Sequence, residues 1–140
     1  LLERHPDVYR FVRRLSRLRL SIQPGRRVPI TLTEFLHRAR IRWHGVRLGA
    51  PDWSEDGHSV AVSFQDVEGS ASAHAIVNAW REPLAFELPR VETAWRQLVD
   101  TSLSAPDDIH RWEEAPEMES ATYLAGPHSV VFLAAEVPSP

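Results

Sequence analysis

The sequence predicts a mainly β protein, an antiparallel β-sandwich preceded by one N-terminal helix and a short second helix. Helical apolar spacing is confined to about the first forty residues, whereas from Ile41 onward apolar and polar residues alternate with a period of two. That change of period is typical of a switch from helices to half-buried strands. Because no helical segment separates the short strands, we expect them to pair antiparallel and to form two packed sheets.

The first predicted helix runs from Asp7 to Leu20, and we assign residues 1–22 to it. Pro6 and Asp7 are residues that commonly start a helix. Its apolar side chains recur at three- and four-residue spacing and form one stripe of Val8, Phe11, Leu15 and Leu18. Arginines occupy the other face, which is typical of a solvated helix surface.

Residues 23–40 are expected to form a linker that contains the short second helix. The sequence QPG at Gln23–Gly25 indicates a turn. Thr31 and Glu34 have the spacing of a capping box, so we expect this helix to start at Thr31 and to end near Ala39.

Residues 41–140 are assigned to the sandwich. Apolar runs predict strands at 41–44, 59–65, 74–80, 84–88, 95–99, 121–124 and 129–134. In the second of these, Val60, Val62 and Phe64 share one face. Residues 100–119 are rich in Pro, Asp and Glu and predict a long loop. Because such a length is uncommon in a compact domain, we expect the loop either to have a function or to cover something that is absent from this chain.

Composition excludes several classes of protein. The 140 residues fit one domain, and the absence of cysteine excludes a disulfide scaffold, a thiol nucleophile and a cysteine-ligated zinc. No apolar run approaches the roughly 20 residues that cross a bilayer, and no secretory signal is visible. We therefore expect no membrane contact and a cytoplasmic location. The chain starts at Leu1 inside a helical pattern, so we expect it to be a fragment of a longer protein.

Charge is distributed unevenly along the chain. Residues 1–47 carry 12 arginines against 3 acids, a balance of +9, and residues 48–140 carry 4 arginines against 16 acids, a balance of −12. A basic N-terminal third is compatible with nucleic-acid binding, but no nucleic-acid-binding motif accompanies it. An ordinary solvated helix face explains these arginines, so we expect no nucleic-acid partner.

No pattern in the sequence predicts a catalytic or metal site. The seven histidines lack the spacing of zinc ligands, and neither a GxSxG nucleophile turn nor a glycine-rich phosphate loop occurs. Adjacent acids such as Asp107 and Asp108 point in different directions in an extended loop, so they do not form the carboxylate pair of a glycosidase. We therefore expect no catalytic residue, no metal and no cofactor in this chain.

Five tryptophans are many for this length, and each offers a flat apolar face and an N–H donor. Trp80 and Trp95 lie in predicted strands, where core packing explains them. Trp43, in a Trp-His-Gly sequence, and Trp53, in a Pro-Asp-Trp-Ser loop, are not explained in this way. For these two, packing in the core or against another domain is the more common fate of a large aromatic, and stacking on a sugar is the alternative.

Several segments, taken in order, resemble one family. The motifs that carry the resemblance are IRWHGV at Ile41–Val46, GAPDWS at Gly49–Ser54, SVAVSF at Ser59–Phe64, AIVNAWREP at Ala75–Pro83, WRQLVDTS at Trp95–Ser102 and SVVFL at Ser129–Leu133. Together they resemble the C-terminal domain of isoamylase-type, or glycogen, debranching enzymes, which belong to the α-amylase superfamily of glycoside hydrolases. Arg10–Leu18 is similar to the last helix of the family's catalytic barrel. In many members an Arg-Arg-x-His-Pro sequence follows that helix, whereas His5 and Pro6 precede it here.

The resemblance implies a C-terminal β-sandwich that packs beside a (β/α)8 barrel, with residues 1–22 as the last helix of that barrel. The catalytic carboxylates of the family lie in the barrel, and none of their motifs occurs in this chain. The resemblance therefore implies that this chain hydrolyses nothing by itself. It also implies that the full protein hydrolyses α-1,6-glucosidic branch points of glycogen or starch.

The first of three candidate functions is that of an accessory domain. Such a domain stabilises the catalytic barrel of the same polypeptide, and its apolar patch faces that barrel. The candidate barrel-facing residues are Phe11, Leu15 and Leu18 of the first helix.

The second candidate is a carbohydrate-binding module that contacts an α-glucan. Trp43 or Trp53 would be the stacking platform, and His44 or Asp52 would form hydrogen bonds with sugar hydroxyls. The third candidate is a stand-alone regulatory or interaction domain that has no connection with glucans. We rank the three in this order.

Overall fold

The computed structural model describes residues 5–21, 40–65 and 71–136. Its elements are α1 (Pro6–Ser21), β1 (Arg40–His44), β2 (Ser59–Gln65), β3 (Ala71–Asn78), β4 (Leu84–Glu87), β5 (Trp95–Asp100), the 3-10 turn η1 (Trp112–Glu114), β6 (Glu117–Met118), β7 (Thr122–Ala125) and β8 (Ser129–Glu136). The predicted turn at 23–25 and the predicted second helix from Thr31 to about Ala39 lie outside the described residues.

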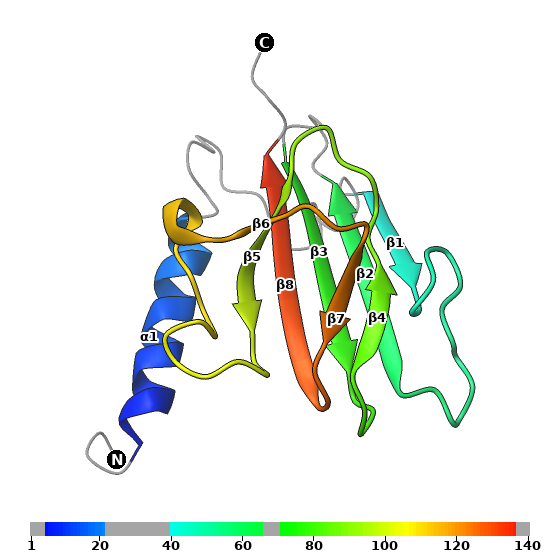
Figure 1. Cartoon of the computed structure of the whole chain (residues 1–140), viewed down its shortest axis with the longest axis horizontal. Helices are drawn as coiled ribbons and strands as arrows, with labels where there is room; N and C mark the ends of the chain where they lie inside the picture. Colours follow the sequence, from blue (N-terminus) through cyan, green and yellow to red (C-terminus); the bar gives the residue numbers. More distant parts are fainter. Residues whose placement is uncertain (1–4, 22–39, 66–70, 137–140) are drawn as a thin grey trace.

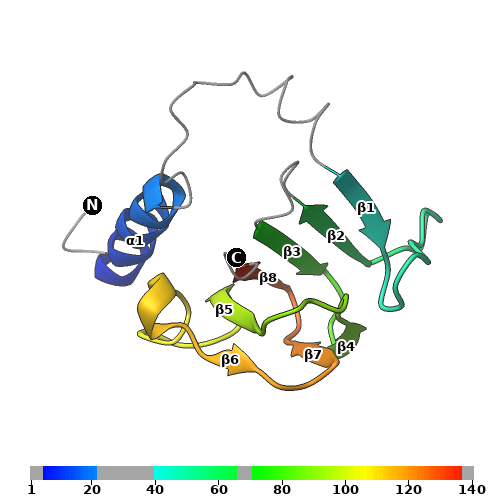
Figure 2. The same ribbon diagram turned by 90° about the horizontal axis from the view of Figure 1, so that it is seen from above.

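The strands form two antiparallel sheets. The larger sheet has six strands in the order β1-β2-β3-β8-β5-β6, and the smaller sheet pairs β4 with β7. Figure 2 shows the β4–β7 pair on one side of the larger sheet and α1 on the other side, near its β5 end. The predicted fold class, mainly β with antiparallel sheets after an N-terminal helix, is therefore confirmed.

The main core fills the space between the two sheets. Phe86 and Tyr123 of the small sheet pack against Ile76, Val131 and Leu133 of the large one, and all five are buried. These large-sheet residues come from alternate positions of β3 and β8, so the period-two pattern places them on one face. Burial of this kind is the main favourable term in the stability of the domain.

Trp95 closes one side of this core. Its side chain is buried with the cluster, and its indole N–H donates to the carbonyl of Pro89 at 2.8 Å. The hydrogen bond satisfies the one polar atom of a large buried ring. Core packing, as the sequence predicted, explains this tryptophan.

Asn78 ties three chain segments together where β3 ends. Its buried carboxamide donates to the carbonyls of Glu82, Ala125 and Gly126 and accepts from the amide of Trp80. The regular strand ends here, two residues before the predicted end, where Asn78 Oδ1 accepts from the amide of Trp80 and turns the backbone.

A second core lies between α1 and the β5 side of the large sheet (Figure 1). It contains Leu18, Leu98, Val99, Ile109 and Ala115, with Phe11 packed against them. This cluster corrects the expectation that residues 100–119 form a long loop without structure. Ile109 bridges to Val99, and the segment also contains η1 and β6. Ile109 and Ala115 of this segment pack against Leu18 of α1 and against β5.

Polar contacts reinforce the docking of α1. The guanidinium of Arg10 pairs with the carboxylate of Asp108, and Arg14 donates to the carbonyl of Ile109 at 3.1 Å. Both contacts join the helix to the 100–119 segment, so what this segment covers is α1 and β5 of the same chain.

Candidate functional site

The loop after β1 has a closely defined conformation. A Cβ on Gly45 would lie 2.4 Å from the carbonyl oxygen of Ala50, and Gly49 has a φ of +69°. Larger residues would be excluded at the first position and strained at the second. The loop is also joined to β4, because Leu48 donates to the Glu87 carboxylate at 2.9 Å and Glu87 donates to the carbonyl of Val46 at 2.9 Å. Residues 45–58 are therefore presented in one arrangement.

His44 holds this loop from the inside rather than facing solvent. Gly49 N–H donates to His44 Nδ1 at 2.8 Å, so Nδ1 is the unprotonated nitrogen and Nε2 carries the hydrogen. Nε2 lies 2.8 Å from Ser63 Oγ, and Ser63 Oγ lies 2.9 Å from His74 Nδ1. Ser63 Oγ therefore accepts from His44 Nε2–H and donates its hydroxyl hydrogen to His74 Nδ1.

Burial keeps both histidines neutral. Desolvation, followed by the neighbouring His44, lowers the pKa of His74 to about 4. Desolvation, followed by the charge of Arg42, also lowers the pKa of His44. With both of its ring nitrogens engaged inside the protein, His44 is a residue that positions the loop. The structure thus does not place it where it could bind a sugar hydroxyl.

Trp43 and Trp53 lie together at the surface. Their ring centroids are 5.6 Å apart and the ring planes meet at 70°, an edge-to-face contact. The residues are nevertheless 51% and 67% exposed. The sequence separates them by ten positions, and the loop folds back to bring them into contact.

Asp52 fixes the backbone next to Trp53. One carboxylate oxygen accepts from the amide of Ser54 at 3.0 Å, and hydrogen bonds from Ser54 lower the pKa of Asp52. This Asx turn orients the peptide that carries Trp53. Asp52 is exposed, so its carboxylate also remains an acceptor at the surface.

A second candidate surface is the face of the large sheet that points away from the small sheet. We call it the outer face, and it consists of Ile41, Trp43, Val60, Val62, Phe64, Ala73, Ala75, Val77, Val130, Phe132 and Ala134. All eleven residues are apolar. Val77 and Val130 are 38% and 44% exposed, whereas Phe132 and Ala134 pack against the cluster beneath α1. The helix therefore covers only the β8 side of this face.

The three predicted barrel-facing residues occupy different environments. Leu18 is buried and Phe11 is partly buried, both against the second core, while Leu15 is 42% exposed. Leu15 shares a stripe with the exposed Val8 and Val12, since positions separated by three or four residues lie on the same side of a helix. Phe11 and Leu18 thus pack on this domain, whereas Val8, Val12 and Leu15 leave an apolar stripe of the helix at the surface.

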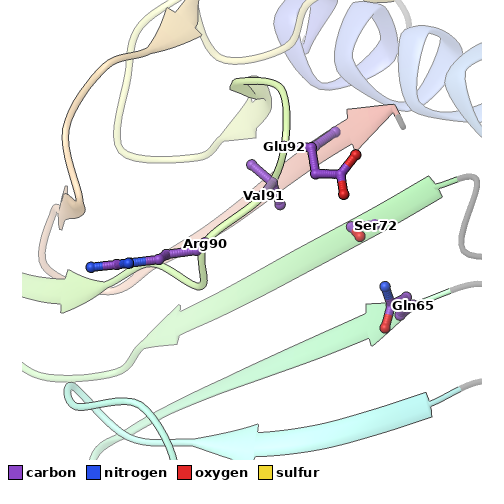
Figure 3. Close-up of a pocket in the computed structure, with 6 residues that line it drawn as sticks. Gln65, Ser72, Arg90, Val91 and Glu92 are labelled. Carbon is purple, nitrogen blue, oxygen red and sulfur yellow. The ribbon is translucent and has the colours of Figure 1, made fainter. Parts of the chain in front are cut away.

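A pocket of about 330 Å³ lies elsewhere, at the end of the sheets that includes Gln65 and Ser72. Figure 3 shows the Glu92 carboxylate directed toward Ser72 and the Arg90 side chain extending away. None of the candidate residues lines it. Within the described ranges no three His, Cys, Asp or Glu side chains gather as metal ligands. Nor does any described helix combine the length and apolarity needed to cross a bilayer.

Sequence reasoning missed the outer face and the two residues that support His44. The outer face had a visible signal, because three successive strands carry apolar residues at every alternate position. For Ser63 and His74 the sequence has no local signal, since their contact with His44 depends on strand register.

Comparison with known proteins places these features in a family. Residues 42–135 match the family model described as "Isoamylase 1-3, C-terminal". The chain is 33% identical over 108 residues to "Isoamylase SU1, chloroplastic" of Zea mays, which covers 76% of this chain. It is 32% identical over 123 residues to "Isoamylase 1, chloroplastic" of Oryza sativa subsp. japonica, which covers 87% of this chain.

The chain corresponds to a small part of those relatives. It spans 13% of the length of the maize protein and 14% of the rice protein. A similar protein of Arabidopsis thaliana, 31% identical over 120 residues, is also matched over 14% of its length. The names of all three describe chloroplastic enzymes, and the cytoplasmic location expected for this chain stays a prediction.

Proposed function

Because the chain belongs to the family of isoamylase C-terminal domains, we propose that it is the non-catalytic accessory domain of a debranching hydrolase. In this proposal it packs against the catalytic barrel of the same polypeptide and stabilises it. The whole protein hydrolyses α-1,6-glucosidic branch points of glycogen or starch by a retaining mechanism, with its carboxylate pair in the barrel.

The outer face carries this proposal. A continuous apolar surface across β1, β2 and β3 is unusual on a monomeric protein and marks a site of contact with another body. The opposite face of the large sheet, with buried residues such as Ile76 and Val131, packs against the small sheet. The outer face therefore presents apolar side chains that the small sheet does not cover.

The helix extends the same surface. α1 lies on the outer-face side of the large sheet (Figure 2), and Val8, Val12 and Leu15 form an exposed apolar stripe on it. Of the residues first expected to face the barrel, Leu15 keeps that role. Phe11 and Leu18 instead attach the helix to the sandwich. The helix would then contact both the sandwich and the barrel.

Two acids of the 100–119 segment have structural partners. Asp108 pairs with Arg10, and Glu117 pairs with Arg96. Both carboxylates therefore hold chain segments together, a role that differs from flanking a scissile bond.

Substitution on the outer face tests the proposal. In the full-length protein, Val130→Glu should lower the thermal midpoint and shorten the half-life of branch-point hydrolysis, because it places a charge in the interface with the barrel. In the 140-residue chain the same change should alter the free energy of unfolding by less than about 1 kcal/mol, since Val130 is exposed there.

Leu124→Glu is the matched control. Leu124 is 66% exposed on β7, in the small sheet on the opposite side, so this variant should leave the full-length protein unchanged. Equal effects of Val130→Glu in the full-length protein and in the 140-residue chain would refute the docking role of the outer face.

A further inference from the structure

We infer that Trp43 and Trp53 form a binding platform for an α-1,4-linked glucan chain, presented by the loop 45–58 at the edge of the domain. The platform shares Trp43 with the β1 edge of the outer face, and the choice of an α-glucan rests on the proposed function. A sugar ring has an apolar face of C–H groups and a rim of hydroxyls. A site for it therefore needs an aromatic surface with hydrogen-bonding groups nearby.

The loop is preorganised for display. The close approach of Gly45 to Ala50, the positive φ of Gly49 and the bond from Gly49 to His44 restrict its backbone. Gly57 is restricted as well, because a Cβ there would lie 2.7 Å from the carbonyl oxygen of Asp52. A loop that is ordered before binding loses little further entropy on contact, which favours affinity for a weak ligand such as a sugar.

The two indoles supply the apolar surface. In the edge-to-face arrangement the ring planes meet at 70°, so the pair forms a corner rather than a flat stack. Only one face of one ring is used in the contact, and more than half of each residue is accessible to solvent. A glucose ring can stack on the open face of one indole while the other indole limits its lateral position.

Polar side chains flank Trp53 in the loop. Asp52 and Ser54 are its neighbours in the sequence, Glu55 and Asp56 follow, and all four are exposed. The hydrogen bonds from Ser54 keep the Asp52 carboxylate ionised, and an ionised carboxylate is a strong acceptor for sugar hydroxyls. A few polar groups around an aromatic surface are the usual composition of a small-molecule site.

The location suits a ligand that extends beyond the domain. Figure 1 shows β1 at the end of the large sheet opposite α1, with the loop that follows it projecting past the sheet edge. Trp43 lies on the outer face, and Trp53 lies at its border. A glucan held there would lie beside the proposed barrel interface, where it could raise the local concentration of branched substrate.

Titration of the 140-residue chain with maltoheptaose tests this inference. The indole N–H signals of its five tryptophans are followed by NMR, with cellohexaose as the β-linked comparison. We expect a saturable shift of the Trp43 and Trp53 signals only, at millimolar maltoheptaose. Trp53→Ala should weaken binding by about tenfold or more, which corresponds to about 1.4 kcal/mol. Leu124→Ala, an equally exposed change on the other side, should leave binding unchanged.

Three results would overturn the inference. These are the absence of a saturable shift, shifts at other indoles, and equal binding of cellohexaose. Circular dichroism of Trp53→Ala, a variant of an exposed loop residue, shows whether the fold is kept. This titration does not involve the barrel. If the chain binds no maltoheptaose, the docking role of the outer face is still tested separately by the thermal stability of Val130→Glu in the full-length protein.

Discussion

Acidification should destabilise the domain through His74. In the folded chain its pKa is about 4, whereas an unfolded histidine has a pKa near 6.5. A histidine whose folded pKa is lowered contributes its stability above the unfolded pKa, where both states are neutral. That contribution is lost as the pH falls from about 6.5 through about 4, because the unfolded state takes up the proton first.

The size of the effect follows from the two pKa values. By about pH 4.5 the loss from His74 alone amounts to about 2.5 kcal/mol, a substantial part of the 5–15 kcal/mol typical of a domain. His44 adds to the loss in the same direction, because its pKa is lowered as well. Protonation of His44 at Nδ1 also removes the acceptor for Gly49 N–H, so the loop 45–58 should loosen together with the core.

Urea unfolding, followed by tryptophan fluorescence between about pH 7 and pH 4.5, measures this dependence. His74→Asn is the informative variant, since its amide oxygen can accept from Ser63 as Nδ1 does, and Nε2 has no partner to lose in the described part of the chain. The variant should be less stable at neutral pH because of its smaller side chain, but it should lose about 2.5 kcal/mol less on acidification. Equal pH dependence in both proteins would refute the reasoning.

Three further substitutions test the packing. Leu18→Ala should cost about 2–4 kcal/mol of unfolding free energy, whereas Leu15→Ala on the same helix should cost far less; equal costs would mean that α1 is not docked on the sandwich. Asn78→Ala removes four hydrogen bonds and should cost about 3 kcal/mol by urea unfolding, and a cost below about 1 kcal/mol would contradict its linking role. Gly45→Ala should displace the loop and shift the Trp53 indole signal in NMR spectra, and an unchanged signal would show that the close approach to Ala50 is not restrictive.

The sequence predicted most strands because their signal is local. Alternation identified β2 with both ends correct, and apolar spacing of three and four residues identified α1 within one residue at each end. Both bounds of β3 were wrong, since the strand runs from Ala71 to Asn78 rather than over 74–80. The buried Asn78 turns the backbone at its end by accepting from the amide of Trp80.

Alternation separates the residues of a strand into two faces, but it does not show which face is buried in the domain. Val60, Val62 and Phe64 are the more apolar side of β2, yet they lie on the outer face, while Ala61 and Ser63 lie toward the small sheet. The small residues are required there because His74 and Phe86 fill the space between the sheets. Such volume complementarity is a property of the assembled core, and it cannot be predicted from one strand.

The candidate site was predicted in part. Trp43 and Trp53 do meet at the surface, and Asp52 is exposed next to Trp53. His44 was placed with them on grounds of sequence proximity, but adjacent strand residues point to opposite faces, so it faces the interior while Trp43 faces out.

Thiol labelling measures whether the outer face docks on a catalytic barrel. The 140 residues contain no cysteine, so Val130→Cys gives a single probe in this chain. Its labelling by a maleimide is measured by mass spectrometry of peptides, with Leu124→Cys as the control. We predict that Val130→Cys labels several-fold more slowly in the full-length protein than in the 140-residue chain, while Leu124→Cys labels equally in both. Equal rates for Val130→Cys in the two proteins would contradict the account.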